Sequence, residues 1–268
     1  MLMLDRGRAV AEKRRVLWLL VVRDLKVRYA NSWLGYVWTV LDPLMMSGVY
    51  WFVFGLIFAG ARRGIGYSPY ILFLVVGVLA WQWFNGAVND TTRALTQESK
   101  LVRSTNLPRE IWVLKIIGAK GVEYVFSIPV VVFFMIIYRQ PPTWQALWAW
   151  PLAIVLQGLL LSGLGMALAA ATVLMTDLQR LVRILLRMWF YLTPVVYGVN
   201  KVPEEHHLRD LMALNPMTGI LDLYRRGVFP NVPTGWHIPV AGAVISVLVF
   251  FAGAVIFRRL ERAVLKEI

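Results

Sequence analysis

Long apolar blocks dominate the chain and restrict what it can fold into. A helix that crosses the hydrocarbon core of a bilayer needs about 20 largely apolar residues. Six blocks approach this pattern, at residues 36–60, 69–90, 111–138, 146–176, 181–199 and 236–257. Because 59% of the 268 residues are hydrophobic and only 16% are charged, a water-facing surface could not cover such a chain. The sequence predicts an all-α membrane protein with six transmembrane helices.

The fifth block is the weakest of the six. Arg183 and Arg187 lie in its first half, and Thr193-Pro194 interrupts its second half. The other blocks are longer or less interrupted. The expected transmembrane domain covers residues 36–258.

Basic residues indicate the orientation. Of the 28 Lys and Arg residues, 21 fall in the N-terminal segment, the second and fourth connections with the helix starts beside them, and the C-terminal tail; seven fall on the other side. Because cytoplasmic connections carry the excess of Lys and Arg, both termini are expected in the cytoplasm. The net charge of +13 is spread beside apolar blocks and does not form one basic domain, so no nucleic-acid partner is expected.

The two ends of the chain are expected to lie outside the bilayer. Residues 1–35 predict a cytoplasmic amphipathic segment along the inner headgroups, with a disordered basic tail as the alternative, and residues 259–268 predict a cytoplasmic tail. Arg23 interrupts the apolar run at residues 16–22 and no cleavage site follows, so we expect no cleaved signal peptide. With no cysteine, no disulfide forms, and the redox compartment stays open.

The connection at residues 91–110 predicts a short helix that ends before Asn106 and Pro108, because the residue before proline is disfavoured in a helix. It is either an ordinary solvated turn or a docking element for a cytoplasmic partner. In the second reading, Leu95, Leu101 and Val102 are its apolar anchors.

The outer connection at residues 203–227 predicts two short helices. Pro203 and Pro216 suit first helical turns, Asn215 suits an N-terminal cap, and Gly227 suits a helix stop. The second helix is largely apolar, so the pair is expected to fold back against or into the outer face of the membrane.

Catalytic signals are weak. No phosphate-binding loop occurs, so ATP hydrolysis would belong to another subunit and no enzyme activity is expected of this chain. His206-His207 beside Glu204-Glu205 is the only His cluster, and a solvated helix face explains it better than a metal site. No catalytic residue, bound metal or cofactor is therefore assigned. Among the acids near the membrane (Asp42, Asp90, Glu123 and Asp177), Glu123 lies deepest, either in an ion pair or as a proton carrier.

Four stretches together resemble the permease subunits of ABC-2 type polysaccharide exporters, which move O-antigen, teichoic acid and capsular polysaccharide. They are RDLKVRYANSWLGYVWTVLDPL at 23–44, NLPREIWVLK at 106–115, FYLTPVVY at 190–197 and ALNPMTGILDLYR at 213–225. The resemblance covers nearly the whole chain. It implies a multi-pass protein of the bacterial cytoplasmic (inner) membrane.

The resemblance also implies partners and sites. Residues 23–29 would form an interfacial helix, and residues 97–108 a coupling helix that docks on an ATPase. The re-entrant outer gate would lie at residues 203–227. Two permeases and two ATPase subunits would form the exporter, with ATP and Mg on the ATPase, and a lipid-linked glycan would pass through the permease homodimer. The expected coupling residues are Gln97, Glu98, Lys100, Leu101, Arg103, Asn106 and Pro108, and the expected gate residues are Pro203, Asn215, Pro216 and Gly227.

Aromatic side chains suit such a cargo, because they stack on sugar ring faces without a fixed register. The channel-lining candidates are Trp81, Trp83, Phe84, Glu123, Tyr124, Trp189, Phe190, Tyr191 and Tyr197; the alternative for each aromatic is packing or a place in the interfacial belt. Small residues at 158–167 permit close helix contact, within one chain or across a dimer.

The leading hypothesis is a homodimeric permease that exports a lipid-linked cell-envelope polysaccharide of O-antigen, teichoic acid or galactan type. An ABC-2 exporter of a drug or small lipid is the alternative. A membrane enzyme and a proton-coupled carrier using Glu123 are the other readings.

Overall fold

The computed structural model describes residues 3–30, 33, 35–57, 66–202 and 208–267, and the regular structure of these residues is helical. In chain order the elements are α1 (Met3–Glu12), α2 (Arg14–Tyr29), η1 (Gly35–Val37), α3 (Trp38–Tyr50), η2 (Trp51–Ile57), α5 (Tyr70–Thr91), α6 (Ser99–Ser104), α7 (Glu110–Ile137), α8 (Ala146–Leu174), α9 (Leu178–Leu192), η3 (Val199–Lys201), α10 (Leu208–Ala213), α11 (Pro216–Arg226) and α12 (His237–Glu267).

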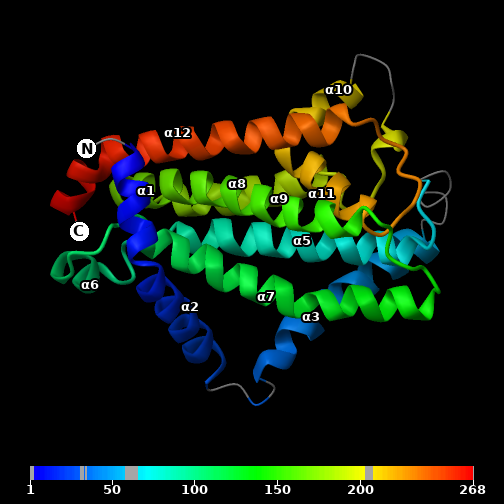
Figure 1. The fold of residues 1–268 in the computed structure, drawn as a ribbon, viewed down its shortest axis with the longest axis horizontal. Coiled ribbons are helices and arrows are strands. Elements are labelled where there is room, and N and C mark those ends of the chain that lie inside the picture. The colour runs from blue at the N-terminus through cyan, green and yellow to red at the C-terminus, as the bar shows by residue number, and fades with distance from the viewer. Residues whose placement is uncertain (1–2, 31–32, 34, 58–65, 203–207, 268) are drawn as a thin grey trace.

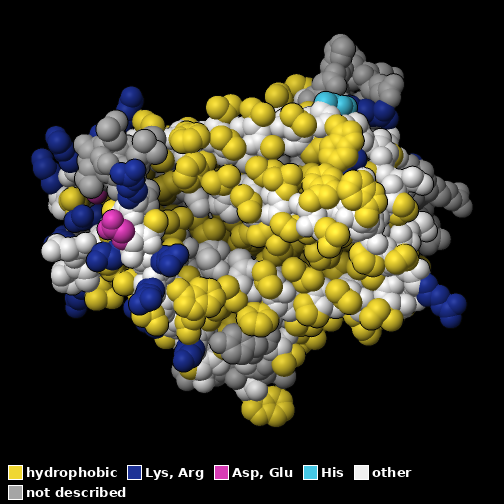
Figure 2. Space-filling model, viewed as in Figure 1, with side chains coloured by type: hydrophobic (Ala, Val, Ile, Leu, Met, Phe, Trp, Pro, Cys, Tyr) yellow, Lys and Arg dark blue, Asp and Glu magenta, His cyan; other side chains and the backbone are white. Residues whose placement is uncertain are grey.

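Within the described residues, five helices are long and apolar enough to cross a membrane: Trp38–Ile57, in which α3 continues into η2, and then α5, α7, α8 and α12. They match five of the six predicted blocks to within a few residues at most ends. The exception is α12, which continues through the predicted tail to Glu267. Hydrophobic side chains cover the middle of the molecule in Figure 2, as lipid contact requires.

The predicted fifth span is not one continuous helix. α9 has 15 residues, which corresponds to a length of about 22 Å and falls short of the roughly 30 Å hydrocarbon core. The helix ends where Thr193 adopts an extended conformation, φ −102° and ψ 135°. Pro194 explains this end, because proline disfavours helical geometry in the residue before it.

The centre of the bundle is α5. In its most apolar stretch 83% of the residues are buried, against 56% or less in the other four long helices. Leu72, Phe73 and Leu74 are fully enclosed, and α5 contacts α3, α7, α8, α9 and α11. α5 is therefore the helix against which the other segments are positioned.

α8 and α12 approach so closely that their backbones touch. A Cβ atom added to Gly163 would lie 2.3 Å from the carbonyl oxygen of Val249, and one added to Gly253 would lie 2.0 Å from that of Gly163. The contact is within one chain, which settles for Gly163 the question that the small residues of α8 left open. Gly158, on the same helix, faces open space.

The two ends of the bundle differ. Figure 1 places both termini and α6 at one end, and α10 at the other. Most Lys and Arg side chains visible in Figure 2 gather at the end with the termini. This distribution agrees with the basic residue count in the sequence.

A branched side chain at Gly163 should separate α8 from α12. We expect Gly163→Val to destabilise the chain by about 1–3 kcal/mol or more through overpacking, and Gly158→Val to have little effect. Thermal unfolding of the purified variants, followed by size-exclusion chromatography in detergent, measures both. Equal melting temperatures would contradict the backbone contact.

Candidate functional site

The segment between α5 and α7 carries the predicted coupling helix, and the structure forms a helix there. α6 (Ser99–Ser104) ends before Asn106 and Pro108, as the sequence predicts. It lies at the end of the bundle that carries both termini (Figure 1). The segment is therefore placed where a partner on that side could reach it.

Four charged side chains hold this segment against two helices. Glu98 Oε1 accepts a hydrogen bond from Arg23 Nη2 of α2 at 2.5 Å and another from Lys115 Nζ of α7 at 2.6 Å. Asp24 completes the group, which we call the Glu98 cluster, at 3.1 Å from Lys115 Nζ. The Lys115 side chain is only 4% exposed, so its ammonium depends on these carboxylates.

The cluster also affects Arg23 itself. Partial burial acts to lower the pKa of Arg23, but the hydrogen bond that Arg23 donates to Asp24 and the negative charges of Glu98 and Asp24 outweigh this effect and raise the pKa. The guanidinium keeps its charge and its two partners.

The segment presents some of its predicted coupling residues and buries two of its predicted anchors. Gln97, Lys100, Leu101, Arg103 and Asn106 are exposed, and Pro108 is half-buried. Leu95 and Val102 are each only 1% exposed and pack into the core of this chain. The expectation that these two residues face a partner is therefore wrong, and of the three anchors only Leu101 is on the surface.

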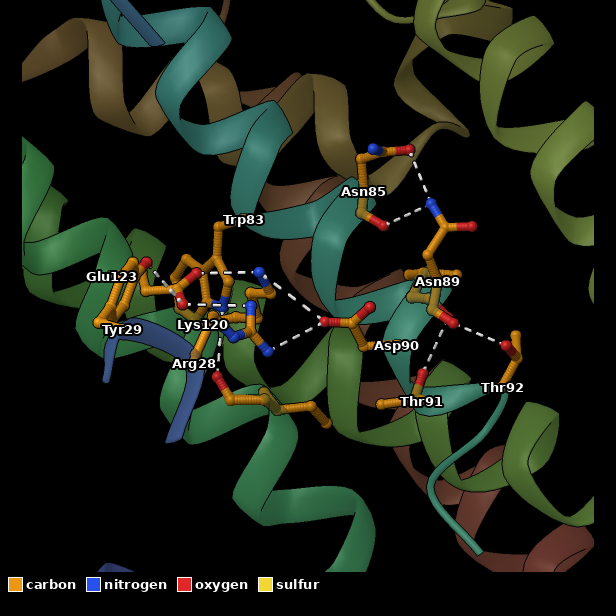
Figure 3. Close-up of polar contacts among 12 residues, drawn as sticks. Arg28, Tyr29, Trp83, Asn85, Asn89, Asp90, Thr91, Thr92, Lys120 and Glu123 are labelled. Atoms are coloured by element: carbon orange, nitrogen blue, oxygen red, sulfur yellow. Dashed lines mark hydrogen bonds and ion pairs between the residues drawn. The ribbon is translucent and has the colours of Figure 1, made fainter. Parts of the chain in front are cut away.

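A second polar cluster joins α2, α5 and α7 (Figure 3). Glu123 lies 2.9 Å from Lys120 Nζ and 3.2 Å from Arg28 Nη1, and it accepts a hydrogen bond from the Tyr29 hydroxyl at 3.1 Å. Asp90 lies 3.3 Å from Arg28 and 3.8 Å from Lys120. These five residues form the Glu123 cluster.

Glu123 thus occupies an ion pair, the first of the two roles that the sequence left open for it. Burial and the Glu123 carboxylate raise the pKa of Tyr29 well above its ordinary value, so its hydroxyl stays protonated and donates a hydrogen bond to Glu123. Two cations and one hydrogen-bond donor therefore surround the Glu123 carboxylate.

A polar cavity of about 390 Å³ lies beside the Glu123 cluster. Arg28, Tyr29, Lys120 and Glu123 line one part of it, and the other lining residues are Trp38, Thr39, Asp42, Pro43, Leu79, Gln82, Trp83, Tyr124 and Ser127. Trp83 stacks on Tyr124, with ring centroids 5.2 Å apart. Three of the predicted channel-lining residues therefore meet at one cavity: Trp83, Glu123 and Tyr124.

The remaining aromatic candidates pack mostly against each other. Trp81 contacts Phe84 and Phe190, with ring centroids 5.3 and 5.5 Å apart. Phe84 also contacts Trp189 at 5.2 Å. Tyr191 is 68% exposed, and Trp189 and Tyr197 line an apolar cavity. Within one chain, Trp81, Phe84 and Phe190 are core residues.

At the opposite end, Asn215 joins α9 to α11. Its side-chain oxygen caps α11 by accepting the Met217 backbone N–H at 3.1 Å, and it also accepts the Trp189 indole N–H. Its amide nitrogen donates to the Thr193 hydroxyl at 2.9 Å. Pro216 stands in the first turn of α11, so the predicted cap and first turn are both confirmed. Pro203 lies outside the described residues.

Gly227 follows the last residue of α11, as predicted, but for a different reason. Its φ is −70°, which any residue adopts. A Cβ atom there would lie 2.3 Å from the Trp150 indole nitrogen. The position needs glycine because of packing.

α11 is buried along its whole length, and this includes Arg225 and Arg226. Arg225 Nη2 donates to the carbonyl oxygens of Pro194 at 2.6 Å and Val195 at 3.1 Å, and its guanidinium carbon lies 3.7 Å from the centroid of the Phe73 ring. Sequence reasoning missed this role. The sequence feature that could have indicated it is Thr193-Pro194, because a break in a helix leaves nearby backbone carbonyl groups without helical donors.

Asp222 pairs with Arg226 at 2.6 Å and accepts a hydrogen bond from the Thr234 hydroxyl. No group of three His, Cys, Asp or Glu residues that could hold a metal occurs in the described part of the chain. The His206-His207 pair lies outside that part.

The long apolar helices define a multi-pass integral membrane protein. Residues 15–229 match the ABC-2 type transporter family. The chain is similar to the O-antigen export system permease protein RfbA of Myxococcus xanthus, 30% identical over 250 residues that cover 93% of this chain and 94% of the relative, and to one from Klebsiella pneumoniae, 28% identical over 246 residues that cover 91% and 92%. The polysialic acid transport protein KpsM of Escherichia coli is 21% identical over 255 residues that cover 92% and 93%.

The chain belongs to the ABC-2 type transporter family, and it is a multi-pass protein of the bacterial inner membrane. The resemblance to polysaccharide export permeases is confirmed. The relatives are transport subunits by name.

Removing the charge of Glu98 should weaken the attachment of the segment between α5 and α7 to α2 and α7. Glu98→Gln leaves Lys115 buried with only Asp24 as its acid, so we expect a loss of stability on the order of 2 kcal/mol. Glu267→Gln, on the exposed last turn of α12, is the control and should melt like the wild type. Thermal unfolding in detergent measures both variants, and an unchanged melting temperature for Glu98→Gln would show that the cluster is not structural.

Proposed function

We propose that this chain is the channel-forming permease of an ATP-driven exporter that moves a lipid-linked cell-envelope polysaccharide across the cytoplasmic membrane. The observation that carries the proposal is the similarity to O-antigen export permeases over more than nine-tenths of the chain. The O-antigen, teichoic acid and galactan types all remain within this class.

The proposed topology has six crossings with both termini in the cytoplasm. α9 and the non-helical residues that follow it would make the fifth crossing together. Non-helical backbone is tolerated at membrane depth only where protein covers it and satisfies its polar groups. Arg225 and the Tyr70 hydroxyl bond the carbonyl groups of Pro194, Val195 and Val196, which supports this crossing and the placement of α10 and α11 as a re-entrant pair.

The ATPase would dock on the exposed side of the α6 segment. Its ATP and Mg would be bound by the ATPase and not by this chain. The Glu98 cluster supports such a role, because it links the segment to α2 and α7 at once. A displacement of α6 by the ATPase would then be transmitted to the interfacial helix α2 and to the spanning helix α7 at the same time.

Two copies of the chain would enclose the conduit. The first spanning segment and α9 both present large exposed hydrophobic side chains, such as Met45 on α3 and Phe52 on η2, and Ile184 and Tyr191 on α9. Faces of this kind must meet lipid or a second copy. Tyr191 is the predicted channel residue best placed to meet a glycan between copies.

An exporter of a small lipid is the second candidate. An apolar cavity of about 820 Å³ lies between α5, α8, α9 and the α10–α11 connection. Its lining includes Leu185, Met188 and Leu211. A cavity of this size and character suits a hydrocarbon chain.

Depletion of the chain in its native cell separates the two candidates. We expect the lipid-linked polymer to accumulate inside the cell, because synthesis continues while export stops. Radiolabelled sugar incorporation and extraction of lipid-linked glycans measure this, and re-expression of the chain is the control. Normal surface polysaccharide after depletion would contradict the proposal.

Leu101 tests the docking surface. It is 41% exposed on α6, so we expect Leu101→Asp to weaken association with the ATPase subunit at least about tenfold. Leu265→Asp is the matched control, since Leu265 is 38% exposed near the C-terminus at the same end of the bundle. Quantitative co-purification measures both, and equal losses would contradict docking through α6.

A further inference from the structure

A second polar cavity, of about 310 Å³, lies between the end of α5 and the first half of α9. Arg93, Arg183 and Arg187 line it, together with Asn85, Asn89 and Asp90. No function discussed above uses the three arginines. The cavity is at the end of the bundle that the proposed topology places in the cytoplasm.

The cavity carries excess positive charge. Its one carboxylate, Asp90, is already shared with Arg28 and Lys120 at 3.3 and 3.8 Å. In the described part of the chain, Arg93, Arg183 and Arg187 form no ion pair with a carboxylate. Three guanidinium groups thus surround a space with no counter-charge of their own.

The fold holds two of these arginines together. Arg183 and Arg187 are four residues apart on α9, so they lie on the same face of the helix. Val182 and Leu186 anchor the other side of α9 in the core, at 5% and 2% exposure. Two like charges at this spacing repel each other, and a bound anion would remove that repulsion.

The chemistry of the lining suits a phosphate group. Guanidinium groups bind phosphate oxygens through paired N–H donors, and these bonds are stronger than neutral hydrogen bonds. The side chains of Asn85 and Asn89 add polar atoms beside them; the Asn89 amide donates to the Asn85 backbone and side-chain oxygens at 2.9 and 3.2 Å. Asn89 is thereby oriented within the lining (Figure 3).

The same two helices also line the apolar cavity of about 820 Å³, through residues such as Val88 and Leu185. Val88 directly precedes Asn89, and Leu185 lies between Arg183 and Arg187 in the sequence. The apolar cavity nevertheless lies on the side of α9 that carries Val182 and Leu186, away from the face that carries Arg183 and Arg187. The apolar cavity is therefore a separate space, and the phosphate site is defined by the arginine-lined cavity alone.

We propose that the arginine-lined cavity binds the diphosphate group of a lipid-linked saccharide. The inference rests on the proposed function, since it identifies the part of the cargo that this chain holds first. It assigns Arg183 and Arg187 as the main ligands, with Arg93 as the third cation. The bilayer phospholipids are the competing source of the same phosphate chemistry.

Binding of farnesyl diphosphate to the full chain in phosphatidylcholine nanodiscs tests the site. The double variant Arg183→Gln and Arg187→Gln should bind at least about tenfold more weakly, because it loses two charge-assisted contacts. Arg180→Gln is the matched control: Arg180 is exposed on the same helix but is not part of the cavity lining. Its affinity should stay within about twofold of the wild type.

Three outcomes would overturn the assignment. They are an equal loss in Arg180→Gln, equal affinity for farnesol, and displacement of farnesyl diphosphate by phosphatidylglycerol at equal concentration. The first would indicate a general surface charge effect, the second would remove the need for phosphate, and the third would assign the site to bilayer phospholipids. Unchanged melting temperatures in all variants show that folding does not cause the loss.

The test separates this inference from the proposed function. Failure to bind farnesyl diphosphate, in a chain whose depletion still blocks glycan export, overturns only the phosphate site. Binding in a chain whose depletion leaves export intact overturns the proposed function and leaves the site standing.

Discussion

The half of the molecule that carries α10 and α11 depends on satisfying the backbone where α9 stops. Pro194 ends the helix, and its carbonyl group and that of Val195 would be costly to bury without donors. Arg225 supplies both hydrogen bonds from a helix that is itself fully buried. The arrangement needs space as well, because a Cβ atom on Gly77 of α5 would lie 2.9 Å from the Val195 carbonyl oxygen. One cation, one glycine and one proline thus fix how α5, α9 and α11 meet.

The half that carries both termini is organised by ion pairs. The Glu98 and Glu123 clusters share α2 and α7, so the segment before the first spanning helix is tied to the bundle at two points. The ion pairs at that end range from the nearly buried Lys115 to the partly exposed Arg28 and Asp90. At the opposite end the charged groups of α11 are buried and must be satisfied by carbonyl groups, aromatic faces and one another. One end is therefore held by ion pairs between helices, and the other by hydrogen bonds and aromatic contacts of buried charged groups.

The sequence predicted the positions of five long helices, the short helix of the coupling segment, and the Asn215 cap, because each follows from local pattern. It failed where tertiary packing decides. Leu95 in the turn before α6 and Val102 on α6 resemble surface anchors, yet both pack into the core. The sequence did not predict which aromatic side chains pack in the core, because contacts such as Trp81 with Phe190 depend on how α5 packs against α9. Arg225 has an ordinary helix-end position in the sequence, and only the distant Thr193-Pro194 break explains its burial.

The contact between Gly163 and Gly253 limits how the bundle can rearrange. Backbones that touch leave no layer of side chains to slide or change rotamer, so α8 and α12 are expected to move as a single rigid unit. Any widening of the molecule must then occur along seams where flexible side chains meet, and the exposed faces of α3 and α9 are seams of that kind. The Gly163–Gly253 contact therefore keeps α8 and α12 fixed relative to each other, in addition to stabilising the fold.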